Sequence, residues 1–137
     1  MEKLGPSLES LYMMCGRKFS LQTVCQIAIQ MLDRIQTVHE IGMIHRDIKP
    51  DNFVIGCQYD PDVGKNFIRI IDFGLSRDYI QITPKGVRHI AETTGRDVVG
   101  TVRYVSIRVH EGVEQSRRDD IEAIGHVLIY FLKPLPW

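Results

Sequence analysis

The sequence predicts an α+β fold that is mostly helical and carries one small β-hairpin. Apolar residues recur at helical spacing over 21–38 and again over 121–132. Between these two segments, short apolar runs at 53–55 and 67–71 have the length and composition of paired strands. With 137 residues, the chain is long enough for one modest domain with a hydrophobic core.

Two helices are expected in the N-terminal third of the chain. Ser7 can cap a short helix that ends near Met14. Ser20 is a second candidate cap, and the long helix after it is expected to end near Ile41, with Gly42 as the residue that leaves the helix.

The middle of the chain is expected to combine loops with the hairpin. Residues 44–52 are polar and include Pro50, which predicts a loop. A turn cluster at 60–64 separates the two predicted strands. From 72 to about 107 the pattern is irregular, and so long an irregular stretch is usually functional or disordered.

The last predicted helix follows Ser116. Ser116 and Asp119 fit a capping box in which Asp119 reaches back to the Ser116 amide. From Ile121 to Leu132 the helix is apolar on most sides, so we expect it to be buried on most sides. Any side of this helix without a packing partner would expose apolar surface.

Composition argues against several classes of protein. Lys plus Arg and Asp plus Glu are both 17, so the net charge is zero and nothing indicates a nucleic-acid or membrane partner. No apolar run could span a bilayer, and the N-terminus lacks a secretory pattern. Cys15, Cys25 and Cys57 show no metal-ligand spacing, so we expect reduced thiols in a cytoplasmic and/or nuclear protein. We also expect the chain to be a monomer.

Two motifs in a fixed order indicate phosphoryl transfer. The segment His45–Asp47 followed by Asn52 has the spacing H-R-D-x-x-x-x-N of the protein kinase catalytic loop. Downstream, 72–74 reads D-F-G. A predicted hairpin between the motifs and a long helix before them make the combination far more specific than either motif alone.

The residue types at these positions suit that chemistry. Phosphoryl transfer has a loose transition state, so catalysis depends on positioning and charge neutralisation. Asp47 would orient the acceptor hydroxyl and accept its proton late, as a weak base with an ordinary pKa of about 3.9. Asn52 and Asp72 would supply oxygen ligands to Mg²⁺, and Lys49 would neutralise the γ-phosphate of ATP during transfer.

The H-R-D-x-K arrangement resembles that of Ser/Thr protein kinases. The Gly100-Thr101 pair followed by Tyr104 also resembles their substrate-docking loop, which implies that the Thr101 hydroxyl bonds Asp47 and Lys49. The nucleotide-binding residues expected from this resemblance are Leu4, Val54, Ile71 and Asp72.

Several of these residues also have a purely structural interpretation. His45 is better explained by packing and backbone bonding than by proton transfer, and Val54 is a core residue by default. Arg46 is either a surface cation or an anchor of the activation segment, and its place beside Asp47 favours the anchor. Asp119 is expected to act only as a helix cap, whereas Asp120 resembles the kinase residue that bonds the catalytic-loop backbone.

The wider sequence resembles the casein kinase 1 family. His45–Phe53 reads H-R-D-I-K-P-D-N-F, the family's form of the catalytic loop. Ser106-Ile107 stands where most kinases carry A-P-E, and Glu114–Asp120 reads E-Q-S-R-R-D-D, close to a family signature. Together with Gly5–Leu8, the resemblance runs over essentially the whole chain.

The resemblance implies protein substrates that are acidic or already phosphorylated. It places Arg103, with Arg96 nearby, in the pocket that binds the substrate anion. Two places depart from the family pattern. Arg108 replaces an Asn, and 91–97 is less basic than the corresponding family segment.

The family's kinase domain is longer than this chain, and a working kinase also needs a Gly-rich loop and a strand Lys that this sequence lacks. We therefore expect 1–137 to be a partial protein kinase domain, a C-terminal lobe that is inactive alone. One hypothesis is a piece of an active Ser/Thr kinase that uses ATP and Mg²⁺. The alternative is a pseudokinase-like binding module without catalysis. The intact set Asp47, Lys49, Asn52 and Asp72 favours the enzyme.

Overall fold

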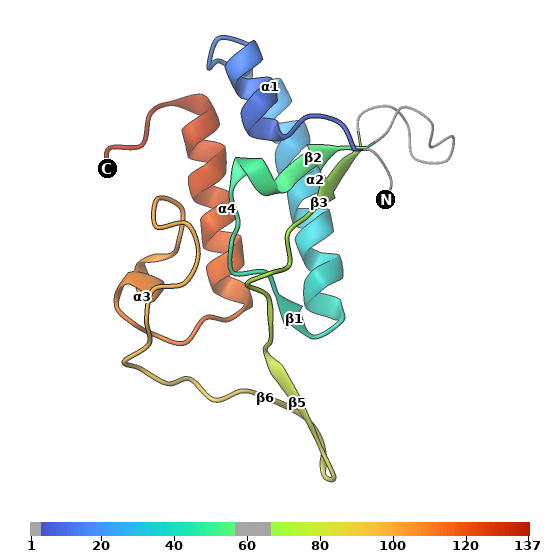
Figure 1. Ribbon diagram of the computed structural model, residues 1–137, viewed down its shortest axis with the longest axis vertical. Helices are drawn as coiled ribbons and strands as arrows, with labels where there is room; N and C mark the ends of the chain where they lie inside the picture. The colour runs from blue at the N-terminus through green and yellow to red at the C-terminus, as the bar shows by residue number, and fades with distance from the viewer. Residues whose placement is uncertain (1–3, 57–66) are drawn as a thin grey trace.

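The computed structural model describes residues 4–56 and 67–137. Its helices are α1 (Leu8–Met14), α2 (Leu21–Glu40), α3 (Ile107–His110) and α4 (Arg117–Leu132), with a 3₁₀ turn η1 (Pro50–Asn52). The long helices α2 and α4 contact each other and form the body of the molecule, and α1 contacts η1 (Figure 1). Within the described residues, no helix combines the length and the apolar character that crossing a membrane requires.

The described strands form three separate antiparallel pairs. These are β1 (Met43–Ile44) with β4 (Arg77–Asp78), β2 (Phe53–Ile55) with β3 (Ile68–Ile70), and β5 (Ile80–Thr83) with β6 (Gly86–His89). The β2–β3 pair packs against α2, whereas the β5–β6 ribbon projects away from the helices (Figure 1).

The predicted helix starts are confirmed. The Ser7 hydroxyl accepts a hydrogen bond from the Ser10 amide at 3.2 Å, and the Ser20 hydroxyl accepts one from the Thr23 amide at 3.1 Å. Such caps satisfy amide groups that have no partner inside the helix. Helix α2 ends at Glu40, and Gly42 adopts a φ of 88°, as expected for the residue that leaves the helix.

The predicted hairpin is also confirmed, with Phe53 opposite Ile70. Its predicted turn cluster at 60–64 lies outside the described residues. The second strand is shorter than predicted, spanning 68–70 rather than 67–71.

Two predictions about irregular segments need correction. Residues 44–52 are not all loop, because Ile44 ends β1 and 50–52 form η1. The stretch 72–107 is also more regular than predicted, since it contains β4 and the β5–β6 hairpin. The hairpin strands are four residues each and mostly exposed, so they carry no apolar run that would reveal them.

The hydrophobic core lies between α1, α2, β2 and α4. Met31, Phe53 and Phe131 are each at most 1% exposed and belong to one cluster. Burying a side chain of this size contributes about 1.5–3 kcal/mol. Tyr12 joins α1 to this core, since its ring lies 5.2 Å from that of Phe131 and its hydroxyl donates to the Tyr130 carbonyl at 3.1 Å.

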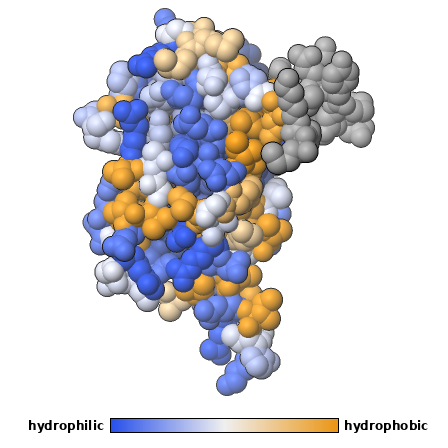
Figure 2. All heavy atoms as spheres, viewed as in Figure 1, coloured by the Kyte–Doolittle hydropathy of each residue, from blue (hydrophilic) through white to orange (hydrophobic). Residues whose placement is uncertain are grey.

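Helix α4 buries one side and exposes the other. Ile124 and Val127 are buried, whereas Ile121 and Leu132 are 43% and 50% exposed. The helix is therefore buried on fewer sides than its composition predicts. Its exposed side carries apolar residues, as expected for a side of the helix that has no packing partner. Figure 2 shows apolar side chains exposed among polar ones on the face viewed, including on the projecting β5–β6 ribbon.

Candidate active site

Asp120, in the first turn of α4, accepts hydrogen bonds from the backbone of the catalytic loop. This carboxylate is 2% exposed and accepts hydrogen bonds from the His45 amide and the Arg46 amide, both at 2.9 Å. It also contacts the His39 ring at 2.9 Å. The expected role of Asp120 is thus present, and it fixes the backbone immediately before Asp47.

The Asp47 carboxylate lies at the centre of the site and is 5% exposed. One of its oxygens accepts from the Thr101 amide at 2.9 Å and the Thr101 hydroxyl at 2.7 Å. The other accepts from the Lys49 ammonium at 2.7 Å and the Asn52 amide group at 3.2 Å. Thr101 and Lys49 are therefore linked through opposite oxygens of Asp47, and not by the direct bond that was predicted.

These contacts keep Asp47 ionised and Lys49 charged. Burial raises the pKa of Asp47, but hydrogen bonds from Lys49, Thr101 and Asn52 outweigh it and hold the pKa below its ordinary value. The hydrogen bond to Asp47 raises the pKa of Lys49, against the effect of burial. Asp72 also raises the pKa of Lys49, so its charge acts on the same group.

The D-F-G segment is tied to the catalytic loop through Ile71. The Ile71 amide donates to the Asn52 carbonyl at 2.9 Å, and the Ile71 carbonyl is 3.0 Å from the His45 ring nitrogen. His45 is fully buried, which agrees with its expected packing and backbone-bonding role. Asp72 has a φ of 64°, an uncommon conformation for a non-glycine residue that often marks functional sites.

Asn52 and Asp72 suit a Mg²⁺ ion that also contacts phosphate. The recorded side-chain bonds of Asn52 use its nitrogen, which donates to the Asp47 carbonyl at 2.8 Å, so its oxygen is left as a ligand. Asp72 is exposed, and one of its oxygens accepts a long 3.3 Å bond from the Gly74 amide. The described residues contain no cluster of three or more acidic, His or Cys side chains that could hold a metal alone. An amide oxygen and a carboxylate fit Mg²⁺, which takes its remaining ligands from water and phosphate.

The predicted nucleotide-binding residues lie at the edge of the β2–β3 pair. Gly5, next to Leu4, donates its amide to the Ile55 carbonyl at 2.8 Å and so runs beside β2. Val54 is buried but does not belong to the core cluster that contains Phe53, its neighbour on the opposite face of the strand. Leu4 and Ile71 are half-buried.

Arg46 anchors the segment after D-F-G, as the sequence favoured. Its Nε donates to the Leu75 carbonyl at 2.6 Å. Burial lowers the pKa of Arg46, and repulsion by Arg77 lowers it further, whereas Glu114 and Asp120 raise it. Arg46 is therefore part of a charged group and is not a simple surface cation.

The two predicted anion-binding residues lie in different surroundings. Arg96 contacts the Glu114 carboxylate at 2.7 Å, which Arg77 also contacts at 2.8 Å. Arg103 is exposed and lines a cavity of about 600 Å³ together with His126 and Trp137. Sequence reasoning missed the role of Glu114, because nothing in the spacing links it to Arg77, 37 residues away.

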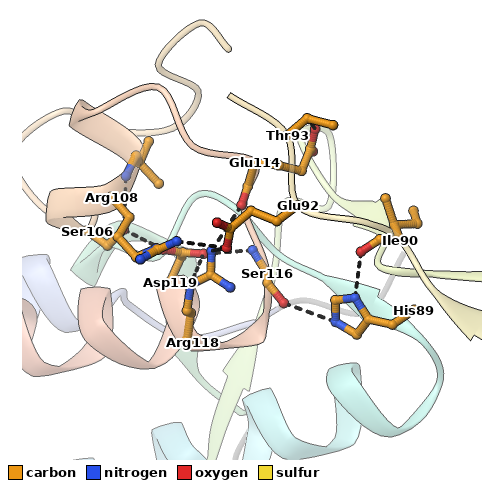
Figure 3. Close-up of polar contacts among 11 residues, drawn as sticks. His89, Ile90, Glu92, Thr93, Ser106, Arg108, Glu114, Ser116, Arg118 and Asp119 are labelled. Carbon is orange, nitrogen blue, oxygen red and sulfur yellow. Dashed lines mark hydrogen bonds and ion pairs between the residues drawn. The ribbon is translucent and has the colours of Figure 1, made fainter. Parts of the chain in front are cut away.

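Asp119 does more than cap α4. One of its oxygens accepts from the Ser116 amide at 2.7 Å, as predicted. The other accepts from the Ser106 hydroxyl at 2.6 Å, and Ser106 is fully buried (Figure 3). The expectation that Asp119 is only a cap is therefore wrong, because it also fixes the segment that leads into α3.

A family model for the protein kinase domain matches residues 4–136. The chain therefore belongs to the protein kinase family. The ordered catalytic loop and D-F-G segment described above are the features on which that membership was predicted.

Within that family, the chain is of the casein kinase I type. It is 53% identical to casein kinase I homolog 1 and 51% identical to casein kinase I homolog 2 of Saccharomyces cerevisiae, in each case over 98% of this chain. It is 50% identical to casein kinase I homolog 2 of Schizosaccharomyces pombe over the same share. The chain spans 24% of the length of the two budding-yeast proteins and 30% of the fission-yeast protein.

Proposed function

We propose that this chain forms the lower wall of a Ser/Thr protein kinase active site, which transfers the γ-phosphate of ATP to protein hydroxyls. The observation that carries the proposal is the Asp47 carboxylate, which is buried, kept ionised and bonded by Lys49, Asn52 and Thr101. Four hydrogen-bond donors fix the orientation of this carboxylate. Correct orientation of the reacting groups is a main source of catalysis in phosphoryl transfer.

Each residue of the site has its own role in the proposed reaction. Asp47 orients the acceptor hydroxyl and takes its proton as the bond to phosphorus forms. Lys49 lies 2.7 Å from Asp47, where its ammonium offsets negative charge that develops on the transferred phosphoryl group. Mg²⁺, when bound, supplies charge neutralisation of the phosphates, and Asn52 and Asp72 would hold it.

We propose further that the preferred substrates are acidic or already phosphorylated proteins. Support comes from the casein kinase I type of the sequence and from Arg103, an exposed guanidinium beside a cavity. A guanidinium is well suited to carboxylate and phosphate because it can donate two parallel hydrogen bonds. Arg96 is a weaker candidate, since Glu114 already partners it.

Acceptor specificity tests the proposed reaction. The whole protein that contains this chain should phosphorylate Ser and Thr in acidic peptides in the presence of ATP and Mg²⁺, and should leave Tyr in matched peptides unmodified. Transfer to Tyr alone would overturn the assignment. If no transfer occurred while ATP still bound, the binding-module alternative would be favoured instead.

Arg103 offers a separate test of the substrate preference. Arg103→Ala should lower kcat/KM for phosphoserine-primed peptides by about tenfold, the size of one lost charge-assisted hydrogen bond, and should spare unprimed peptides. Arg88→Ala, at an exposed arginine on β6, is the matched control. Equal losses on primed and unprimed peptides would contradict the role of Arg103.

A further inference from the structure

Glu92 lies between two arginines that come from separate helices. One carboxylate oxygen, Oε2, accepts from Arg108 Nη2 at 2.7 Å and from Arg118 Nη2 at 3.2 Å. Arg108 belongs to α3 and Arg118 to α4, whereas Glu92 lies in the extended segment after β6. Figure 3 shows the bonds from both guanidinium groups converging on this one side chain.

The carboxylate of Glu92 satisfies this pair of arginines incompletely. Both bonds end on the same oxygen, and the buried Nε of Arg108 has no hydrogen-bond partner. A guanidinium binds an oxyanion best through two parallel bonds that use two of its nitrogens. The arrangement therefore offers more donors than Glu92 accepts, and a phosphate with three terminal oxygens would use them more fully.

Room for such a group lies beside Glu92. A hollow of about 100 Å³ is lined by Glu92, Arg118, Ser116 and His89, among others. The Ser116 hydroxyl and the His89 ring nitrogen are 3.3 Å apart, so the hollow also presents further polar groups (Figure 3). Glu92 is 52% exposed at its side chain, so it can rotate into solvent without unfolding its surroundings.

The other contacts of Arg118 orient it and do not neutralise it fully. Its Nη2 is 3.4 Å from the Glu114 carbonyl, and its Nε is 3.7 Å from the Asp119 carboxylate. Asp119 is already bonded by the Ser106 hydroxyl at 2.6 Å and the Ser116 amide at 2.7 Å. Arg118 is thus held in place while its charge remains directed towards Glu92.

We propose that Arg108 and Arg118 form a binding site for a phosphorylated or acidic polypeptide side chain, and that Glu92 occupies this site from within the chain as a competing anion. An incoming phosphoserine displaces Glu92 and binds both guanidinium groups through several of its oxygens. This site is separate from Arg103 and from Asp47, so it is a second anion site and does not depend on catalysis.

Peptide binding to the 137-residue chain, measured by fluorescence anisotropy at low salt, tests the proposal. The probe is a labelled phosphoserine peptide, and a peptide with unmodified Ser in the same sequence reports background binding. Glu92→Gln should bind the phosphoserine peptide about fivefold more tightly than the parent chain, because an exposed ion pair of modest strength no longer competes. Glu111→Gln changes the net charge equally at an exposed glutamate that directly follows α3, and it should bind like the parent.

A second substitution shows whether Arg108 is the receptor. Adding Arg108→Gln to Glu92→Gln should return phosphoserine binding to the background of the unmodified peptide, whereas adding Arg88→Gln should not. A glutamate in place of phosphoserine should bind, but more weakly, since it offers fewer oxygens. The proposal is overturned if Glu92→Gln binds no tighter than Glu111→Gln, or if the gain persists without Arg108 in a chain whose circular dichroism is unchanged.

Discussion

Among single residues, Asp47 shows how the fold controls a functional group. Its side chain is bonded by Thr101 from one side and by Lys49 and Asn52 from the other. Thr101 lies 54 residues downstream in the chain, so the carboxylate is positioned only when the segment after β6 has returned to the catalytic loop. Gly100 makes this approach possible, because a Cβ there would lie 2.3 Å from the Arg46 carbonyl oxygen.

In the proposed reaction Thr101 positions Asp47, and its hydroxyl can be removed without removing its backbone bond. In the whole protein, Thr101→Val should lower kcat by about tenfold and leave KM for the peptide nearly unchanged, because Asp47 loses one of its fixed donors. Thr101→Ser keeps the hydroxyl and should restore most of the rate. If both variants matched the parent in kcat, Thr101 would have no role in positioning Asp47.

The Asp47–Lys49 pair also predicts how stability depends on pH. The lowered pKa of Asp47 stabilises the fold above the ordinary carboxyl pKa of about 3.9, and this contribution is lost as pH falls through the lowered value. The raised pKa of Lys49 stabilises the fold below about 10.4, and this contribution is lost as pH rises through the raised value.

Lys49→Met should therefore lower the free energy of unfolding by about 1–3 kcal/mol at neutral pH, as expected for a charged hydrogen bond. The difference from the parent should narrow as pH falls from about 3.9 through the lowered pKa of Asp47, because protonation of the Asp47 carboxylate removes the pair. Urea denaturation of both chains over this range measures it, with Lys133→Met as an exposed control. A difference that stayed constant down to the acid limit of folding would count against the pair.

Among the elements, α4 links the helical body to the site. Its first turn supplies Asp119 and Asp120, which are adjacent in sequence but bond different segments. Asp120 holds the catalytic loop, and Asp119 holds Ser106 and the start of the helix itself. One helical turn thus fixes the position of two loops that are far apart along the chain.

Asp119→Ala should cost more than the loss of an ordinary cap. It leaves the buried Ser106 hydroxyl and the Ser116 amide without acceptors, so we expect a loss of about 2–4 kcal/mol in the free energy of unfolding. Ser20→Ala removes only the cap of α2 and should cost about 1 kcal/mol. Urea denaturation compares the two variants, and an equal cost would mean that the Ser106 contact contributes nothing.

Elements with a strong local signal could be predicted, and those fixed by distant partners could not. The serine caps and apolar periods of α1, α2 and α4 lie within each helix, so the sequence alone reveals them. In the β5–β6 hairpin, Ile80 and Ile82 do alternate with polar residues, but each strand has only four residues and Ile82 is 88% exposed, so the apolar pattern is too short to indicate a strand. The grouping of Lys49, Asn52 and Thr101 around Asp47 could be predicted, because the first two belong to the same short motif as Asp47 and the pair Gly100-Thr101 has a recognisable pattern. The Arg77–Glu114 and Glu92–Arg108 pairs have no such pattern and required coordinates.

For the whole molecule, the proposed function makes the described residues one wall of an active site. Asp47 is buried while Asp72 is exposed, so the site faces outward on the side of Lys49 and the D-F-G segment. The sequence contains no Gly-rich G-x-G-x-x-G motif to cover the phosphates.

The isolated 137-residue chain should accordingly show negligible transfer to an acidic peptide, because ATP is not positioned without that cover. Incorporation of ³²P from labelled ATP measures it, and Asp47→Asn provides the background. Incorporation that clearly exceeds this background would show that the 137-residue chain suffices for catalysis.

In the proposed reaction, Asp47 is the residue that positions and deprotonates the acceptor hydroxyl. We would measure single-turnover phosphate transfer by the whole protein, comparing the parent with Asp47→Asn and with Asp33→Asn on the exposed side of α2. We expect Asp47→Asn to lower the rate by about 10² or more with unchanged circular dichroism, and Asp33→Asn to have no effect. A folded Asp47→Asn protein that transferred phosphate at the parent rate would contradict this role of Asp47.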